Sequence, residues 1–201
     1  MRWSGVARTL VLGLFVAGAL TACGDDGGQE SVEAPSVTAA EVEDPIDLSE
    51  DGETSESGRV TIPGFDEVAV EVTNEAGDVL EWCLLLAAAA DQWSQGLMRV
   101  VDLGDYAGML FDFPDDEVGR SGGFWMQDTP LPLTVAYLDA EGRIVSTADM
   151  EPCVGRGDDC PSYPPTGPYA DTVEVPQGGL EALGLDGPDA RLVQAGSCST
   201  T

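Results

Sequence analysis

Short apolar runs separated by turn-forming residues dominate the chain from residue 59 onward. Runs rich in Val, Leu and aromatic residues are bounded by Gly, Pro and Asp, a pattern typical of β-strands. The run Val68-Ala69-Val70-Glu71-Val72, for example, alternates as a half-buried strand does. A more helical composition occurs around residues 88–96 and 180–183. The pattern predicts one mostly β domain over residues 59–201, long enough to bury about two-thirds of its unfolded surface.

A hairpin is predicted where two such runs flank an acidic turn. Residues 133–138 and 143–148 are rich in apolar side chains, and Asp139-Ala140-Glu141-Gly142 joins them. Tight hairpin turns need positive φ angles, which glycine adopts without steric cost. We therefore expect Gly142 to have a positive φ.

The N-terminus has the pattern of an export signal. Arg2 and Arg8 precede an uncharged apolar stretch, residues 10–20, that is too short for the roughly 20 residues a spanning helix needs. Leu20-Thr21-Ala22-Cys23 resembles a bacterial lipobox, which implies cleavage before Cys23 and lipidation of its thiol. Residues 1–22 are therefore predicted to be a lipoprotein signal peptide, which would anchor the protein on the extracytoplasmic face of the membrane. A plain secretory signal is the alternative.

An acidic segment follows the proposed lipid anchor. Residues 24–58 contain twelve acidic residues and no basic one, and few of their side chains are large and apolar. Such a segment cannot bury enough apolar surface to fold and is extended by its own charge. We predict that residues 23–58 are a disordered linker, with an acidic docking tail as the alternative.

The charge balance excludes several classes of partner. The chain has 37 acidic and 8 basic residues, for a formal net charge of −29 at pH 7. A polyanion gains no affinity from displacing counterions, so nucleic acid and direct contact with anionic lipid are disfavoured. Cations, neutral glycans and basic proteins remain as partners.

The chain contains no histidine. This excludes Ser-His-Asp and Cys-His catalysis as well as zinc sites built on imidazole. Carboxylates remain as metal ligands, and they favour hard ions such as calcium. The sequence assigns no catalytic residue, no metal ligand and no cofactor.

Four cysteines remain once Cys23 is lipidated, an even number in an oxidising compartment. They can pair in three ways. We favour a bond between Cys153 and Cys160, which closes a short Gly- and Asp-rich loop, and by elimination one between Cys83 and Cys198. A redox-active or metal-binding thiol pair is the alternative, although six intervening residues are not the redox spacing.

Four sequence blocks occur in a recognisable order, and the gaps between them have suitable lengths. They are Gln95-Gly96-Leu97-Met98-Arg99, Gly108 to Phe113, Phe124 to Leu133, and Cys160-Pro161-Ser162-Tyr163. Together they resemble the bacterial and archaeal domain of unknown function 192 over about residues 67–193. The resemblance implies a compact, mainly antiparallel β barrel or sandwich with one or two short helices. It implies frequent export, but no established reaction or ligand.

Several polar positions depart from the pattern of that family. The family typically has arginine at position 95, a basic residue at 127, asparagine at 128 and aspartate at 134, where this chain has Gln95, Gln127, Asp128 and Thr134. The apolar and glycine positions agree. We therefore expect any specificity peculiar to this protein near Gln127 and Asp128.

Five residues are candidates for ligand binding: Arg99, Trp125, Gln127, Asp128 and Thr129. Aromatic faces such as that of Trp125 bind sugar rings, although a bulky triplet among strands also suits a core. Asp128 and Thr129 precede a proline and are equally typical of a turn. Arg99 could contact an anionic ligand or pair with a carboxylate of the protein.

These observations favour a non-catalytic binding or accessory domain displayed on the cell surface. Its partner would be a cell-wall glycan or an exported protein. The alternative is a glycan hydrolase with paired carboxylates, in which Asp128 would face Asp112 or Glu174 across a pocket at roughly 5 to 9.5 Å. A purely structural envelope protein is the third hypothesis.

Overall fold

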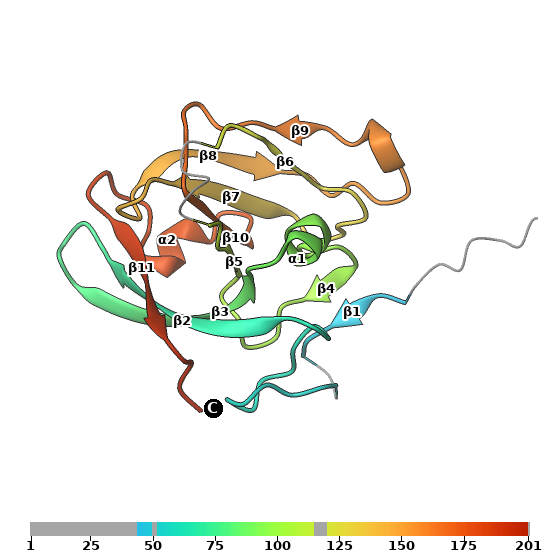
Figure 1. Cartoon of the computed structure of the whole chain (residues 1–201), viewed down its shortest axis with the longest axis horizontal. Coiled ribbons are helices and arrows are strands. Elements are labelled where there is room, and N and C mark those ends of the chain that lie inside the picture. Colours follow the sequence, from blue (N-terminus) through green and yellow to red (C-terminus); the bar gives the residue numbers. More distant parts are fainter. Residues whose placement is uncertain (1–43, 50–51, 115–119, 201) are drawn as a thin grey trace, which may run out of the picture. The chain divides into compact units, whose positions relative to one another are not determined.

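The computed structural model describes residues 44–49, 52–114 and 120–200. Seven strands form one mixed sheet (Figure 1). In the order in which they lie side by side, they are β11 (Arg191–Gly196), β2 (Asp66–Thr73), β3 (Val79–Ala87), β5 (Met109–Phe111), β10 (Asp171–Pro176), β7 (Leu133–Leu138) and β8 (Ile144–Met150). Neighbouring strands are antiparallel except β3 and β5, which are parallel.

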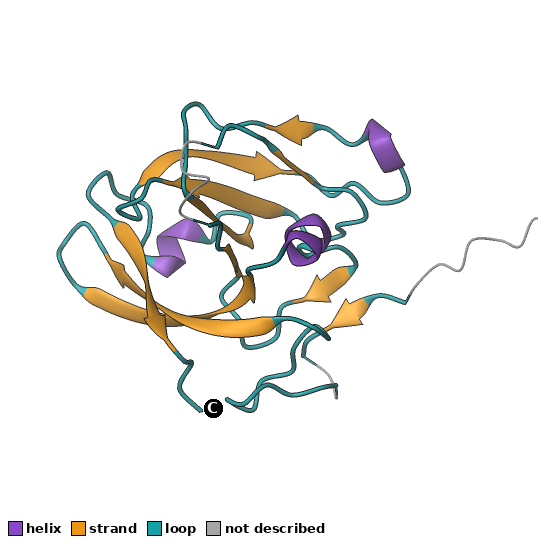
Figure 2. Cartoon of the chain, in the orientation of Figure 1, coloured by secondary structure: helices purple, strands orange, loops and turns teal. Residues whose placement is uncertain are grey.

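The remaining elements are short. They are two small strand pairs, β1 (Ile46–Asp47) with β4 (Val100–Asp102) and β6 (Phe124–Trp125) with β9 (Ser162–Tyr163), a 3₁₀ turn (Gly157–Asp159), and the helices α1 (Ala90–Gln95) and α2 (Leu180–Leu183). Strands and loops thus make up most of the described chain (Figure 2). The mainly β fold with two short helices that the sequence predicts is confirmed.

The seven-stranded sheet curls until its two edges meet. The backbone of Arg143, just before β8, forms an isolated bridge with Arg191 of β11. Next to it, the Leu192 N–H donates a hydrogen bond to the Gly142 oxygen at 3.0 Å. Gly142 has a φ of 77°, which confirms the positive φ expected in this turn. The sheet is therefore closed on itself at this seam.

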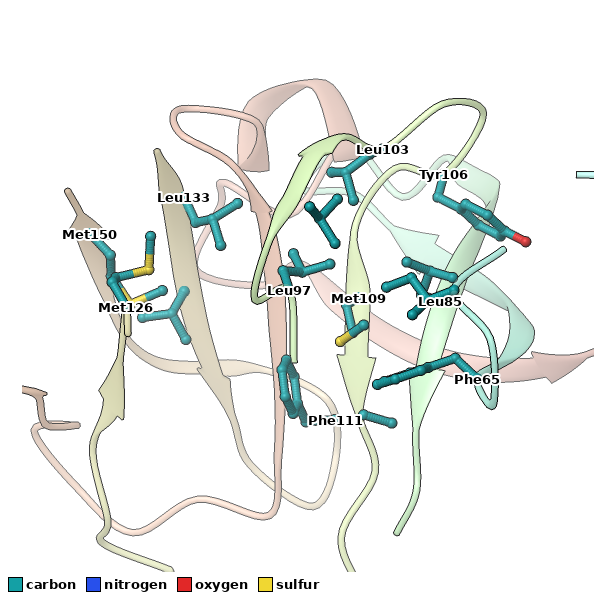
Figure 3. Packing of buried hydrophobic residues seen from close by; sticks show 14 of the residues in the cluster. Phe65, Leu85, Leu97, Leu103, Tyr106, Met109, Phe111, Met126, Leu133 and Met150 are labelled. Carbon is teal, nitrogen blue, oxygen red and sulfur yellow. The ribbon is translucent and has the colours of Figure 1, made fainter. Parts of the chain in front are cut away.

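Alternate residues of the strands face two separate cores. On β10, Val173 and Val175 contribute to an inner core that also contains Leu180 and Leu183 of α2, which lies within the curve of the sheet (Figure 1). The outer face of the sheet carries a second core, which α1, β4 and β6 cover. Figure 3 shows this outer core, where the side chains of Leu97, Met109, Phe111 and Leu133 lie near one another. Because both faces are covered, a residue on either face of β10 is buried.

Two disulfides tie the loops to the domain. Cys83 of β3 is bonded to Cys198, and Cys153 is bonded to Cys160. These are the two pairings that the sequence favours. Glu67 lies close to the Cys83 and Cys198 sulfurs, but these sulfurs are bonded to each other and are not thiolate ligands for a metal.

The last part of the predicted linker packs on the domain. The Ile46 N–H donates to the Arg99 oxygen at 2.9 Å, and Leu48 is buried. The Ser57 hydroxyl donates to the Glu67 carboxylate at 2.9 Å. Residues 46–48 thus lie against the domain, where β1 pairs with β4, a strand some fifty residues further along the chain. The predicted signal peptide and the predicted linker up to residue 43 lie outside the described residues.

Within the described ranges, none of the helices is both long enough and apolar enough to cross a membrane.

Candidate functional site

A pocket of about 510 Å³ opens on the outer face of the sheet. Its walls come from α1 and the turn that follows it, from β5 and β10, and from the segment around β6. Pockets of about 300 to 1,000 Å³ are typical of sites for small molecules. This pocket is the best candidate site among the described residues because it combines that size with the side chains described below.

Aromatic side chains contribute much of the wall. Trp93 lies 5.0 Å from Phe113, and Phe111 lies 4.8 Å from Phe124, as measured between ring centroids. The Trp93 ring nitrogen donates to the backbone oxygens of Ala87 and Asp112, which fixes the ring of this helical residue against the sheet. The Phe111 and Phe124 rings meet edge to face, a favoured arrangement that helps to hold the wall together.

Arg120 provides a positive charge in the same wall. Its guanidinium carbon lies 4.0 Å from the centre of the Phe113 ring and 5.5 Å from that of Trp93. Its backbone pairs with that of Tyr169 through two hydrogen bonds of 3.2 and 3.1 Å. Burial raises the pKa of Tyr169, and the nearby Arg120 charge offsets part of that rise. The cation and the rings stabilise each other in a manner typical of cation–π contacts.

Glu174 of β10 lines the pocket from the sheet. It lies between Met109 of β5 and Val135 of β7, and only 4% of its surface is exposed. None of the described residues donates a hydrogen bond to its carboxyl group. Burial raises the pKa of this carboxyl from its ordinary 4.5 to about 8, so the group is mostly protonated at neutral pH. A carboxyl group in this state can donate or accept a proton, or bind a cation as it ionises.

Tyr137 of β7 holds the pocket-lining residue Phe124 in place. Its hydroxyl donates to the Tyr163 oxygen and accepts a hydrogen bond from the Phe124 N–H at 3.1 Å. Burial raises the pKa of Tyr137 to about 12; the bond from the Phe124 N–H opposes this rise, and the charges of Tyr169 and Glu174 add to it. Tyr137 is therefore a neutral structural support.

The family model DUF192, described as "Uncharacterized ACR, COG1430", matches residues 71–191. The chain belongs to the DUF192 family. No curated protein matches it.

Two solved structures are similar to this DUF192 domain. One, from Sinorhizobium meliloti 1021, is described as a "putative transcription regulator"; it has a TM-score of 0.56 and 26% identity, over 68% of this chain and 100% of that chain. The other is a protein of unknown function from Novosphingobium aromaticivorans DSM 12444, with a TM-score of 0.52 and 24% identity, over 73% of this chain and 94% of that one. The second likeness concerns the fold alone.

In this DUF192 domain, two of the five candidate residues line the pocket. They are Trp125, which is 49% exposed, and Thr129, which is buried and donates its hydroxyl to the Gln127 oxygen at 3.2 Å. The triplet around Trp125 divides between the two roles considered for it: Met126 is part of the core, while Phe124 and Trp125 line the pocket.

The other three candidates lie outside the described pocket lining. Arg99 and Asp128 both have positive φ angles, of 65° and 48°, and the Arg99 N–H donates to the Asp128 oxygen at 2.7 Å. The Asp128 carboxylate accepts a hydrogen bond from the Gly155 N–H at 3.1 Å. Gln127 forms a bridge with Cys153. These residues join neighbouring loops, which suits the turn interpretation of Asp128.

The paired carboxylates of the hydrolase hypothesis do not meet in this pocket. Of the described lining residues, Glu174 is the one that carries a carboxyl group, and neither Asp112 nor Asp128 is among them. From the sequence, Glu174 is predicted only as a partner for Asp128, and no pattern points to Arg120. Gln95, a position where the family typically has arginine, does line the pocket.

Proposed function

We propose that this protein is a cell-surface lipoprotein whose domain binds a ligand without catalysing a reaction, and that the ligand occupies the aromatic pocket. The observation that supports this best is the half-exposed Trp125 beside a wall of fixed aromatic rings. Exposed aromatic faces beside a few polar groups suit the ring of a sugar. A cell-wall glycan is therefore the favoured ligand, and an exported protein is the alternative partner.

Two other functions have less support. A glycosidase needs a second carboxyl group across the site, and Glu174 is the single one in the described lining. A role in transcription, suggested by the description of the Sinorhizobium protein, does not suit a chain with 37 acidic and 8 basic residues.

Replacing Trp125 with alanine is expected to weaken glycan binding about tenfold, because the exposed ring face is lost, worth about 1 to 1.5 kcal/mol. Calorimetric titration with soluble cell-wall fragments would measure the effect. The full-length Cys23→Ser chain, which cannot be lipidated at that residue, is the protein for this and the other solution experiments.

Two variants control this measurement. Trp125→Phe keeps an aromatic face at the same position and should retain most of the affinity. Val154→Ala removes apolar surface from a residue that is 60% exposed and outside the described pocket lining, and should change nothing. Equal affinities for the alanine and wild-type proteins at position 125 would argue against a glycan in this pocket.

Lipidation is tested separately on the full-length chain with Cys23 intact. In a bacterial host fed a labelled fatty acid, the wild-type protein should carry the label and sediment with membranes, because two or more acyl chains anchor a protein firmly. The Cys23→Ser protein should lose the label and leave the membrane fraction. An unlabelled wild-type protein that is recovered in the medium would favour the plain secretory signal.

A further inference from the structure

The pocket contains a buried carboxyl group for which the described residues provide no partner. Glu174 is 4% exposed, yet it lines the pocket and receives no hydrogen bond from them. Burial alone accounts for its altered acidity, without an offset from Arg120. An ionisable group buried without a counter-charge is costly, and such groups are concentrated at functional sites. Glu174 thus indicates a ligand that supplies the missing partner.

The chemistry around Glu174 favours an organic cation over a metal ion. A calcium ion would need six to eight oxygen ligands, whereas the described lining has one carboxyl group. The ring of Trp125, which is 49% exposed and lines the pocket, presents a negative π face of the kind that attracts an ammonium group. The chain's net charge of −29 also raises the local concentration of cations.

Arg120 restricts where the cation of such a ligand can lie in the pocket. Its guanidinium covers the faces of Phe113 and Trp93, so a ligand cation is repelled from that part of the wall. The ligand would therefore place its cation at Glu174, away from the Arg120 charge.

We propose that this pocket binds a ligand that carries a protonated amine, with the ammonium group paired to the Glu174 carboxylate. This inference rests on the proposed function and specifies its ligand. In cell-wall material, a protonated amine can come from an amino sugar without an acetyl group or from the side chain of a diamino acid.

Binding is expected to release a proton and hence to depend on pH. Near Glu174, the other titratable or charged groups of the described residues are Tyr137 on β7 and, in the pocket wall, Tyr169 and Arg120. Burial raises the pKa of both tyrosines, so they stay neutral near pH 7, and an arginine stays charged. The chain has no histidine. Glu174 is thus the described group of the pocket that changes its charge in this range.

The experiment compares three probes by calorimetric titration: a glucosamine oligomer, its N-acetylated counterpart of equal length, and a lysine peptide blocked at both ends. We expect the lysine peptide, whose side-chain amine stays protonated at both pH values, to bind about ten times more tightly at pH 7.0 than at pH 6.0, because a proton must leave Glu174. In Glu174→Gln, this pH dependence should vanish and the affinity at pH 7.0 should fall at least tenfold. Glu141→Gln, which removes an exposed charge from a hairpin turn, should behave like the wild type.

Each outcome decides the proposal. Whichever amine probe shows the Glu174-dependent affinity identifies the source of the ammonium group. Unchanged amine binding in Glu174→Gln, or equal affinity for the acetylated oligomer, overturns the amine inference; the proposed function survives if Trp125→Ala still weakens binding. Absence of binding by all three probes at millimolar concentration overturns the amine inference, and the proposed function then depends on the other cell-wall fragments.

Discussion

Replacing Glu174 with glutamine is expected to abolish a loss of stability that the wild-type protein undergoes between about pH 4.5 and pH 8. Burial raises the pKa of this carboxyl group to about 8, whereas its ordinary value is 4.5. In this range the folded state holds a proton that the unfolded state has released, so the free energy of unfolding decreases as the pH rises. The contribution of the protonated Glu174 to the free energy of unfolding is fully present below pH 4.5. It is lost as the pH rises through 8, and the total loss is up to about 5 kcal/mol.

Urea unfolding at pH 5.0 and pH 8.5 would measure this difference. The glutamine variant stays neutral, so the free energy of unfolding should change less with pH than in the wild type, and the variant should be the more stable protein at pH 8.5. Glu141→Gln also removes one negative charge, but from an exposed position, and therefore corrects for general repulsion among the many acidic residues. Parallel pH profiles for the wild type and Glu174→Gln would show that the carboxyl group is not buried as the structure indicates.

Glu174 also shows why only part of the candidate site could be predicted from the sequence. The run Thr172-Val173-Glu174-Val175 alternates polar and apolar residues, which is typical of a strand with one face in water. The structure covers both faces, and the covering elements α1 and β6 are distant in sequence from β10. No periodicity within β10 carries that information. Trp125 could be named from the sequence because the face of an aromatic ring can bind a sugar ring, whatever the local structure.

The fold was easier to predict than the candidate site because the sequence signals of its strands and turns are local. Alternation identified β2, and the acidic turn ending in Gly142 identified the β7–β8 hairpin. The parallel pairing of β3 with β5 and the strand β1 could not be foreseen in this way. In both cases, the pairing depends on partners that only the folded chain brings together. For β1, the acidic residues around Ile46 and Leu48 also favoured the prediction of a linker over that of a strand.

Replacing Gly142 with alanine is expected to destabilise the protein by about 3 to 4 kcal/mol. Gly142 has a φ of 77°, and a Cβ atom there would overlap the backbone oxygen of Leu192. The substitution thus combines the cost of a left-handed conformation, about 1 to 2 kcal/mol, with displacement of the β11 backbone at the seam of the sheet. The hydrogen bond from Leu192 to Gly142 would be strained as well, at a cost of about 1 kcal/mol.

Gly77→Ala is the matched control for this prediction. Gly77 also lies in a turn between two strands and has a φ of 86°, but a Cβ atom there would meet nothing within 4 Å. It should therefore cost only the conformational strain, about 1 to 2 kcal/mol. Urea unfolding of the two variants measures the difference, and amide hydrogen exchange at Leu192 should accelerate in Gly142→Ala alone because its bond spans the seam. Equal losses of stability in the two variants would mean that contact between β8 and β11 contributes nothing, and that the sheet is held in its curve by the inner core alone.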